Sequence, residues 1–408
     1  MQQMPVTNEP ATIFVAGAGI ISAIGNNLAE CFASLKDGQD GIGIMQWLHS
    51  AHRETLPVAE VKLSNNDLAA ICGLPEHYTR TALLSAVAAQ EAIHDAGIPG
   101  FADWRTGFIS ANTTGGMDKT ETFFESFLQD PASGKIREVV HHECGSPTEI
   151  VAEHLGINHY VSTISTACSS SANAIMYAAR LIRNDKLDIA IAGGVDALTR
   201  FTLNGFNTLM ILDKEACRPF DEHRNGLNLG EGAGYLVLVS EQVAKTIISK
   251  NLYCKFSGGA NANDAYHQTA SSPDGTGSYL AMHGALLQSR LHPADISYIN
   301  LHGTGTSNND ASESTAINRL FEVPFPKMSS TKSFTGHTLG ASGGIEAVFS
   351  ALSLREQVVF PSLRVTTPIA GFEFQPETSY LEGVSVNNVL SNSFGFGGNC
   401  SSLVFSKL

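Results

Sequence analysis

The sequence has few charged residues, and most of them are acidic. Charged side chains make up 16 % of the 408 residues, and the net charge is −14. An acidic surplus repels phosphate backbones, so we exclude a nucleic acid as the main partner. Hydrophobic residues account for 43 % of the chain, which excludes intrinsic disorder and leaves enough apolar surface for a large core.

Long apolar runs are also missing. No segment approaches the ~20 consecutive apolar residues that span a bilayer, and residues 1–10 lack the basic stretch and apolar region of a signal peptide. The seven cysteines are irregularly spaced and include no C-x-x-C pair, which favours reduced thiols over disulfides or a zinc site. We therefore expect a soluble cytoplasmic protein without membrane partners.

Glycine, in contrast, is abundant. The chain holds 38 glycines, about 9 % against a usual ~7 %, and they gather in small-residue clusters after apolar, β-branched segments. Such segments alternate with helix-like stretches, which indicates an α/β fold. The expected strands are residues 12–18, 106–110, 160–165, 188–192, 254–257 and 296–301, and the expected helices are residues 80–96, 169–183, 279–290 and 312–321.

Two segments repeat one pattern. Residues 165–181 and 328–354 each run from a strand through a turn of small residues into a helix. This indicates a duplicated α/β unit, and the absence of a low-complexity linker indicates that the halves pack as one body. We place the halves at residues 1–250 and 251–408.

A cysteine stands in the first of these turns. Cys168 lies in the segment TACSSSA, after a strand and before a helix. A helix N-terminus carries partial positive charge and free N–H groups, which we expect to lower the pKa of the Cys168 thiol and make it a nucleophile. A buried structural cysteine is the alternative.

Two histidines follow strands in the second half. His302 lies in HGTGT and His337 in KSFTGHTLGASGG. Ligands of open α/β sheets bind at the carboxyl ends of strands, so both rings should meet Cys168 there. The segment NSFGFGG, residues 392–398, is a glycine-rich turn whose backbone N–H groups can form an oxyanion hole.

Together these four segments resemble the β-ketoacyl-[acyl carrier protein] synthases, condensing enzymes of the thiolase superfamily, over residues 11–406. The ordered Cys–His–His set resembles the elongating members, because thiolases carry a second active-site Cys and the initiating synthases carry an Asn in place of one His. The resemblance implies a thiolase-like fold of two duplicated βαβ halves in α-β-α-β-α layers. It implies no cofactor for catalysis.

The resemblance also implies roles. Cys168 would take an acyl group from a carrier-protein thioester, whose oxygen lies between the backbone N–H groups of Cys168 and Phe396. His302 and His337 would bind the malonyl thioester and stabilise the enolate that forms when carbon dioxide leaves. Lys332 would order this site, and the Phe396 ring would gate the acyl pocket.

Two further sets of residues are implied in the same way. Substrate contacts along the phosphopantetheine path and the acyl pocket are assigned to Thr304, Thr306, Thr114 and Phe394. Oxygen donors around a structural cation in some family members match Asn300, Glu346, Ser391 and Asn392. A hydrogen-bond cluster without metal is the alternative for the second set.

The expected partners are acyl carrier protein, with acyl and malonyl groups on its phosphopantetheine arm, and a second subunit in a homodimer or in a heterodimer with a related chain. Docking cations are expected at Arg200, Lys119 or Arg137, because residues 63–74 contain no basic side chain.

The pathway stays open between fatty-acid elongation and a specialised polyene or polyketide route. Thr113, Thr114 and Leu227 depart from common family residues near the acyl pocket, which slightly favours the specialised route. A non-catalytic chain-length partner is disfavoured because the nucleophile and both histidines are present. A coenzyme A-dependent thiolase is disfavoured because its second active-site Cys is missing.

Overall fold

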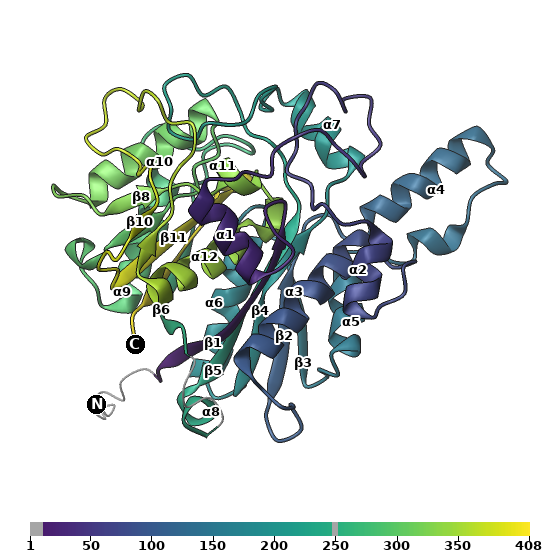
Figure 1. Ribbon diagram of the computed structural model, residues 1–408, viewed down its shortest axis with the longest axis horizontal. Helices are drawn as coiled ribbons and strands as arrows, with labels where there is room; N and C mark the ends of the chain where they lie inside the picture. Colours follow the sequence, from purple (N-terminus) through teal and green to yellow (C-terminus); the bar gives the residue numbers. More distant parts are fainter. Residues whose placement is uncertain (1–10, 247–251) are drawn as a thin grey trace, which may run out of the picture.

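Ten strands form one mixed sheet, shown in Figure 1. The structure is a computed structural model that describes residues 11–246 and 252–408. The strand order is β3-β2-β4-β5-β1-β6-β12-β11-β7-β8, and the strands are β1 (Ile13–Ser22), β2 (Thr106–Ala111), β3 (Tyr160–Ile164), β4 (Ile189–Asp196), β5 (Gly232–Ser240), β6 (Cys254–Asn263), β7 (Tyr298–Asn300), β8 (Lys327–Ser329), β11 (Asn388–Gly395) and β12 (Asn399–Ser406). A separate short pair consists of β9 (Val358–Val359) and β10 (Leu381–Glu382).

The sheet is built from two halves of the same topology. Numbered in chain order within each half, the five strands run 3-2-4-5-1 from the outer edge inward. In each half the two outer pairings are parallel and the two inner ones antiparallel. The halves join where β1 pairs with β6. This repeated order confirms the predicted duplication; the boundary placed between residues 250 and 251 lies outside the described residues.

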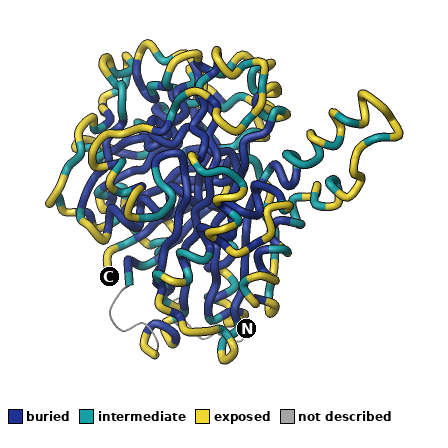
Figure 2. The backbone as a smooth tube through the Cα atoms, turned by 45° about the vertical axis from the view of Figure 1, so that its right-hand side comes forward, coloured by how far each residue is buried: buried dark blue, intermediate teal, exposed yellow. Residues whose placement is uncertain are grey.

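Two central helices lie between the two halves of the sheet and pack against both. α6 (Ser170–Arg183) and α12 (Ser342–Glu356) each contact strands of both halves. α3 (Arg80–Ala96) covers the outer face of the first half, and α9 (Thr276–Ser289), with α10 (Ser307–Leu320) packed against it, covers that of the second. The result is the expected α-β-α-β-α layering, with the buried residues concentrated in the inner layers (Figure 2).

Close packing in the first half depends on small residues. α3 begins after Thr79, whose hydroxyl accepts from Ala82 N at 3.2 Å, and it ends at Gly97 with a left-handed φ of 63°. β1 passes so near this helix that a Cβ on Gly19 would lie 2.1 Å from Ala88 O, so only glycine fits there. These signals are readable in the sequence, and the bounds predicted for helix 80–96 are confirmed.

Other predicted elements differ at their ends. The helix expected from residue 312 begins earlier, at Ser307, because Thr306 caps it and accepts from Asn309 N at 3.4 Å. The remaining helices are α1 (Leu28–Asp37), α2 (Asn65–Cys72), α4 (Met117–Gln129), α5 (Gly145–His154), α7 (Arg200–Thr208), α8 (Glu241–Thr246) and α11 (Lys332–Thr335). None of the helices in residues 11–246 and 252–408 combines the length and the apolar character needed to cross a bilayer.

A helical arm, which consists of α4 and the residues after it up to Val140, projects from this body. α4 has no buried residue, and Figure 1 shows it extending away from the sheet. Exposed apolar side chains lie on the arm at Phe124, Leu128, Ile136 and Val140. Because no residue of α4 is fully buried, tertiary packing contributes little to this helix, and its apolar side chains remain exposed to solvent.

Candidate active site

Hydrogen bonds within the turn fix the position of Cys168. The residue follows β3 and precedes α6. Ala167 before it has a left-handed backbone with φ 54°. The Ser170 hydroxyl accepts from Thr166 N at 2.7 Å and donates to Ala167 O at 2.5 Å. The sulfur is thereby held at the carboxyl end of the strand, where Cys168 is only 5 % exposed.

His337 contacts this sulfur directly. Its Nε2 lies 3.1 Å from Cys168 Sγ, and its Nδ1 lies 2.9 Å from Ser342 Oγ. The backbone N–H of His337 donates to the backbone carbonyl of Asn228 at 2.7 Å, and the backbone carbonyl of His337 accepts from Gly230 N at 2.9 Å. These bonds place the imidazole between the nucleophile and the start of α12.

His302 lies beside His337, with the ring centroids 5.4 Å apart and the planes at 86°. Lys332 Nζ is 3.3 Å from His302 Nδ1. An ammonium group can only donate, so Nδ1 of His302 is the acceptor and its ring proton lies on Nε2. The carboxylate of Glu313 fixes the same turn by accepting from His302 N and Gly303 N, both at 2.9 Å.

Lys332 is also paired with a carboxylate in the protein interior. Its Nζ bonds Glu346 Oε1, and the two side chains are only 2 % and 3 % exposed. Burial raises the pKa of Glu346 to about 7, and the charge of Lys332 opposes that rise. The ammonium therefore links His302 to Glu346, and moving it would leave a buried charge unpaired.

The electrostatics of the site favour neutral groups. Burial raises the pKa of Cys168 to about 11, although the backbone N–H of Phe396 and the charge of Lys332 act to lower it. The lowered thiol pKa predicted from the helix N-terminus is therefore wrong. Burial and the charge of Lys332 hold the pKa of His302 and His337 well below the usual value. At neutral pH the site holds a thiol and two neutral imidazoles.

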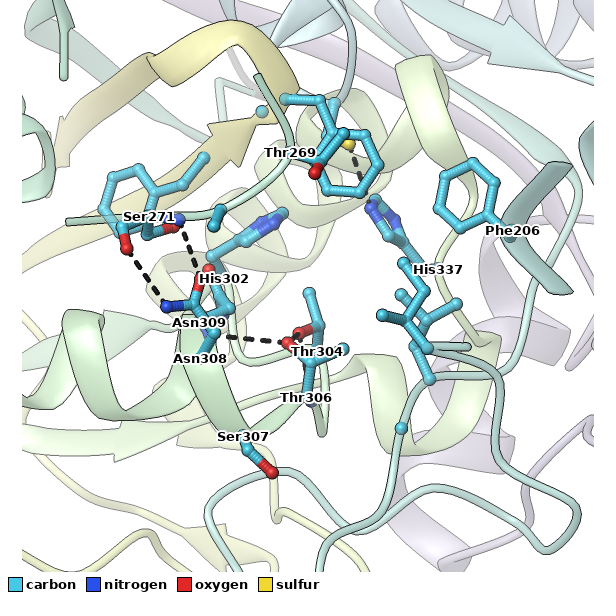
Figure 3. Close-up of a pocket in the computed structure, with 18 of the residues that line it drawn as sticks. Phe206, Thr269, Ser271, His302, Thr304, Thr306, Ser307, Asn308, Asn309 and His337 are labelled. Carbon is cyan, nitrogen blue, oxygen red and sulfur yellow. Dashed lines mark hydrogen bonds between the residues drawn. The ribbon is translucent and has the colours of Figure 1, made fainter. Parts of the chain in front are cut away.

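These groups line one cavity of about 370 Å³, drawn in Figure 3. Cys168, His302 and His337 line it together. The predicted substrate residues Thr304 and Thr306 also line it, with their hydroxyl oxygens 2.9 Å apart. Further lining side chains are Phe394, Phe396, Phe206, Met210, Ile211 and Leu227.

Phe396 brings a second backbone N–H to the nucleophile. This amide lies at the Cys168 thiol, together with the amide of Cys168 itself. A Cβ on the preceding Gly395 would lie 3.0 Å from Cys168 N, so glycine permits this close approach. Two converging N–H groups are what an oxyanion hole requires. The Phe396 ring stacks on Phe206 of α7, with centroids 5.5 Å apart and planes at 16°.

Thr114, predicted to contact the acyl group, is not among the described residues that line this cavity. Instead its N and Oγ1 donate to Asp196 Oδ1 at 3.0 and 2.9 Å. Asp196 also accepts from Thr113 N and Oγ1 at 2.8 and 2.7 Å and from Gly340 N at 2.7 Å. This buried carboxylate joins the turn after β2 to the turn that follows His337.

Sequence reasoning missed Asp196 and the part that α7 takes in the site. A single aspartate at the end of a strand has no distinguishing pattern. Phe206 and Met210 reach the cavity only because the chain turns back after α7, and no motif signals that turn. Among the cavity residues contributed by this region, only Leu227 stood out in the sequence.

The four candidate cation ligands are incompletely hydrogen-bonded. Ser391 of β11 pairs with Asn300 of β7. The side-chain atoms Asn300 Oδ1 and Glu346 Oε2 are buried and find no hydrogen-bond partner among the described residues. Asn392 Oδ1, in contrast, accepts from Ser402 Oγ at 2.8 Å. Buried oxygens without donors fit a hard cation.

Comparison with known proteins identifies the family. The family model "Beta-ketoacyl synthase, N-terminal domain" matches residues 11–244, and "Beta-ketoacyl synthase, C-terminal domain" matches residues 253–366. The chain therefore belongs to the β-ketoacyl synthase family. It is a condensing acyltransferase with the thiolase-like fold.

Individual relatives cover almost the whole chain. The 3-oxoacyl-[acyl-carrier-protein] synthase 2 of Staphylococcus aureus (strain COL) is 32 % identical, over 97 % of this chain and 98 % of its own. The solved structure of the ishigamide ketosynthase/chain length factor aligns with a TM-score of 0.92 at 27 % identity, over 98 % of this chain and 100 % of its own. The ketosynthase ApeO, solved in complex with its chain length factor ApeC from Xenorhabdus doucetiae, aligns with a TM-score of 0.84 at 30 % identity, over 99 % and 100 %. A type II ketosynthase solved with its acyl-carrier protein (AntDE:AntF) aligns with a TM-score of 0.88 at 25 % identity, over 98 % and 100 %.

Proposed function

We propose that this chain condenses the malonyl group of malonyl-[acyl carrier protein], with loss of carbon dioxide, with an acyl group held on Cys168. The observation that carries the proposal is the meeting of three groups in one cavity: a buried thiol, a neutral imidazole 3.1 Å from its sulfur, and a second imidazole whose proton is fixed on Nε2 by Lys332.

In the first step, the Cys168 sulfur attacks the thioester of an acyl carrier and the carrier sulfur leaves. Because the pKa of the thiol is about 11, its proton must leave during the attack, and His337 Nε2 is the base within reach. The proton then passes to the departing sulfur. The tetrahedral oxyanion is held by the backbone N–H groups of Cys168 and Phe396.

In the second step, the malonyl thioester carbonyl accepts from Nε2 of His302 and of His337. The bond to the carboxylate carbon breaks, carbon dioxide leaves, and its electron pair forms an enolate that both donors stabilise. The enolate carbon attacks the acyl carbonyl, the bond to Cys168 breaks, and the released Cys168 thiolate takes up a proton from water. Ser342 Oγ can donate or accept at His337 Nδ1, so His337 can serve both steps.

Mass spectrometry tests this proposal. The protein is mixed with acyl-carrier protein alone, and then with malonyl-carrier protein added. We expect one acyl group on Cys168, then release of carbon dioxide and a 3-oxoacyl product. Cys144→Ser is the matched control, since Cys144 is half-buried and lies outside the cavity-lining set; it should load normally. Failure of every carrier thioester to load Cys168 would refute the proposed function.

We place the enzyme in a specialised polyene or polyketide route rather than in fatty-acid elongation. The likeness to a ketosynthase from a type II PKS supports this, as does Leu227 in the cavity wall. The loading assay decides it when saturated and polyunsaturated acyl carriers compete. Extension of saturated chains alone would place the enzyme in fatty-acid elongation.

We further propose that a second chain of the same fold covers the exposed edge of β3 and the α4 arm. β3 ends the sheet, and Phe124 and Leu128 are exposed on the arm; unpaired edges and apolar patches of this kind favour association. The second chain is either another copy of this chain or a related subunit. Light scattering of the purified chain distinguishes these: a mass twice 43.3 kDa indicates a homodimer, and a monomer indicates a related partner subunit.

The cytoplasm, where its seven free cysteines stay reduced, is the proposed compartment.

A structural cation is proposed at Asn300, Glu346, Ser391 and Asn392, because the buried oxygens Asn300 Oδ1 and Glu346 Oε2 find no donor among the described residues. It takes no part in the condensation. Elemental analysis after extensive dialysis, and the shift in melting temperature on adding monovalent or divalent salts, tests it. No bound metal and no shift beyond that of a choline salt would favour a hydrogen-bond cluster without metal.

A further inference from the structure

The catalytic cavity opens beside an exposed methionine. Met210 lies just after α7, lines the cavity that contains Cys168, and is 89 % exposed. The turn is ordered, since Met210 N donates to Asn207 O at 3.0 Å and Leu209 N to Gly205 O at 3.2 Å. The preceding residue, Leu209, is 42 % exposed, so a second exposed apolar residue adjoins Met210 in the chain.

The backbone of Met210 adopts a conformation that is unfavourable for its residue type. Its φ is 56°, in the left-handed region that non-glycine residues adopt only at a cost. An exposed apolar side chain in that conformation gains nothing from its own fold. Methionine is flexible and polarisable, and it adapts to apolar surfaces of partner proteins.

Some cations in this part of the chain are paired with carboxylates. Arg200, one of the docking cations expected from the sequence, lies 3.2 Å from Glu125 and 3.5 Å from Glu121, whereas the other two, Lys119 and Arg137, are in no ion pair with any described residue. Arg218 lies 3.3 Å from Glu215. In the same loop as Met210, Lys214 is exposed and is in no ion pair with any described residue.

We infer that the carrier protein docks through apolar contact with Leu209 and Met210, here called the mouth patch, and not through a basic surface. This inference rests on the proposed function, because a thioester carried on a protein can reach Cys168 only if the carrier body sits over this mouth. Leu209 and Met210 are both uncharged, so docking through the mouth patch does not depend on the net charge of −14 that the chain carries. Lys214 adds at most one charge contact at the rim.

The test compares two forms of one substrate: an acyl group on carrier protein, and the same acyl group on free pantetheine, which needs no docking. The measured quantity is the ratio of kcat/KM for the two forms. Met210→Glu should lower this ratio about tenfold, as for loss of an interface anchor, mainly through a higher KM for the carrier. Leu287→Glu is the matched control, because Leu287 is also exposed, at 65 %, but lies near the far end of α9; it should leave the ratio unchanged.

Salt separates apolar from charged docking. We expect the KM of the wild-type chain for the carrier substrate to change less than about threefold between about 50 mM and about 0.5 M salt, because screening acts only on charges. Lys214→Glu should have less effect on the ratio than Met210→Glu. A steep salt dependence, a larger effect at Lys214, or an unchanged ratio in Met210→Glu would overturn the inference. If neither substrate form loads Cys168, the proposed function fails instead.

Discussion

Removing Lys332 should lower the free energy of unfolding through the lost contact with Glu346, and the rate of malonyl decarboxylation through the lost contact with His302. The ammonium bonds Glu346 in the interior, with both side chains almost fully buried, and also reaches His302 Nδ1. Breaking a buried ion pair by deleting one partner costs about 3–5 kcal/mol. Lys332→Met should therefore lower the free energy of unfolding by about that amount, measured by denaturant titration. Malonyl decarboxylation should fall about 10²–10³-fold, because the His302 donor loses the contact that fixes its proton on Nε2.

The double variant Lys332→Met/Glu346→Met separates the two effects. Removing the orphaned carboxylate should restore most of the lost stability, because a buried pair can be replaced by apolar residues at little cost. Decarboxylation should stay low, since His302 still lacks its partner. A single variant as stable as wild type would refute the reasoning on burial. Recovery of decarboxylation in the double variant would refute the role assigned to Lys332 in orienting His302.

Three further predictions concern the nucleophile, the histidines and the buried aspartate. Cys168→Gln should load no acyl group but still release carbon dioxide from malonyl-carrier protein; loss of both activities would contradict the division of labour. The pKa values of His302 and His337 are lowered in the folded state, so below about pH 6.5 the unfolded chain binds more protons than the folded chain. As the pH is lowered below about 6.5, the free energy of unfolding should therefore fall by up to about 1.4 kcal/mol per pH unit for each ring. Asp196→Asn cannot accept every bond that Asp196 accepts and should cost about 1–3 kcal/mol, with slower loading of Cys168; unchanged unfolding and loading would show that its bonds hold nothing in place.

The sequence predicted most of what depends on local signals. Helix 80–96 has its cap and its terminating glycine in the sequence, and both bounds are confirmed. The turn of Cys168 and the strand end of His302 follow from apolar segments that meet small residues, and the family resemblance brought them together correctly. α4 has no buried face, so no apolar periodicity against the core announces it. Met210 lines the cavity from the turn after α7, and no sequence motif marks that turn.

The thiol pKa shows why local reasoning was insufficient. A helix N-terminus lowers the pKa of a nearby cysteine, and this effect can be read from strand–turn–helix order. Burial of Cys168 cannot be read that way, because the elements that cover it come from residues far along the chain, including Phe396 and His337. Desolvation is the largest influence on this thiol and raises its pKa to about 11. The nucleophile thus needs a base at contact distance, which the fold supplies.

The duplication explains why the nucleophile Cys168 and the two histidines, His302 and His337, lie in one site. In strand order β3 corresponds to β8 and β2 to β7, so Cys168 and His337 follow equivalent strands, each leading into a central helix. His302 follows β7, and the equivalent turn after β2 holds Thr114 bound to Asp196. One copy of that turn therefore carries chemistry while the other anchors the His337 segment through Gly340. Neither half holds the nucleophile and its imidazoles together, so catalysis requires the two halves in one body.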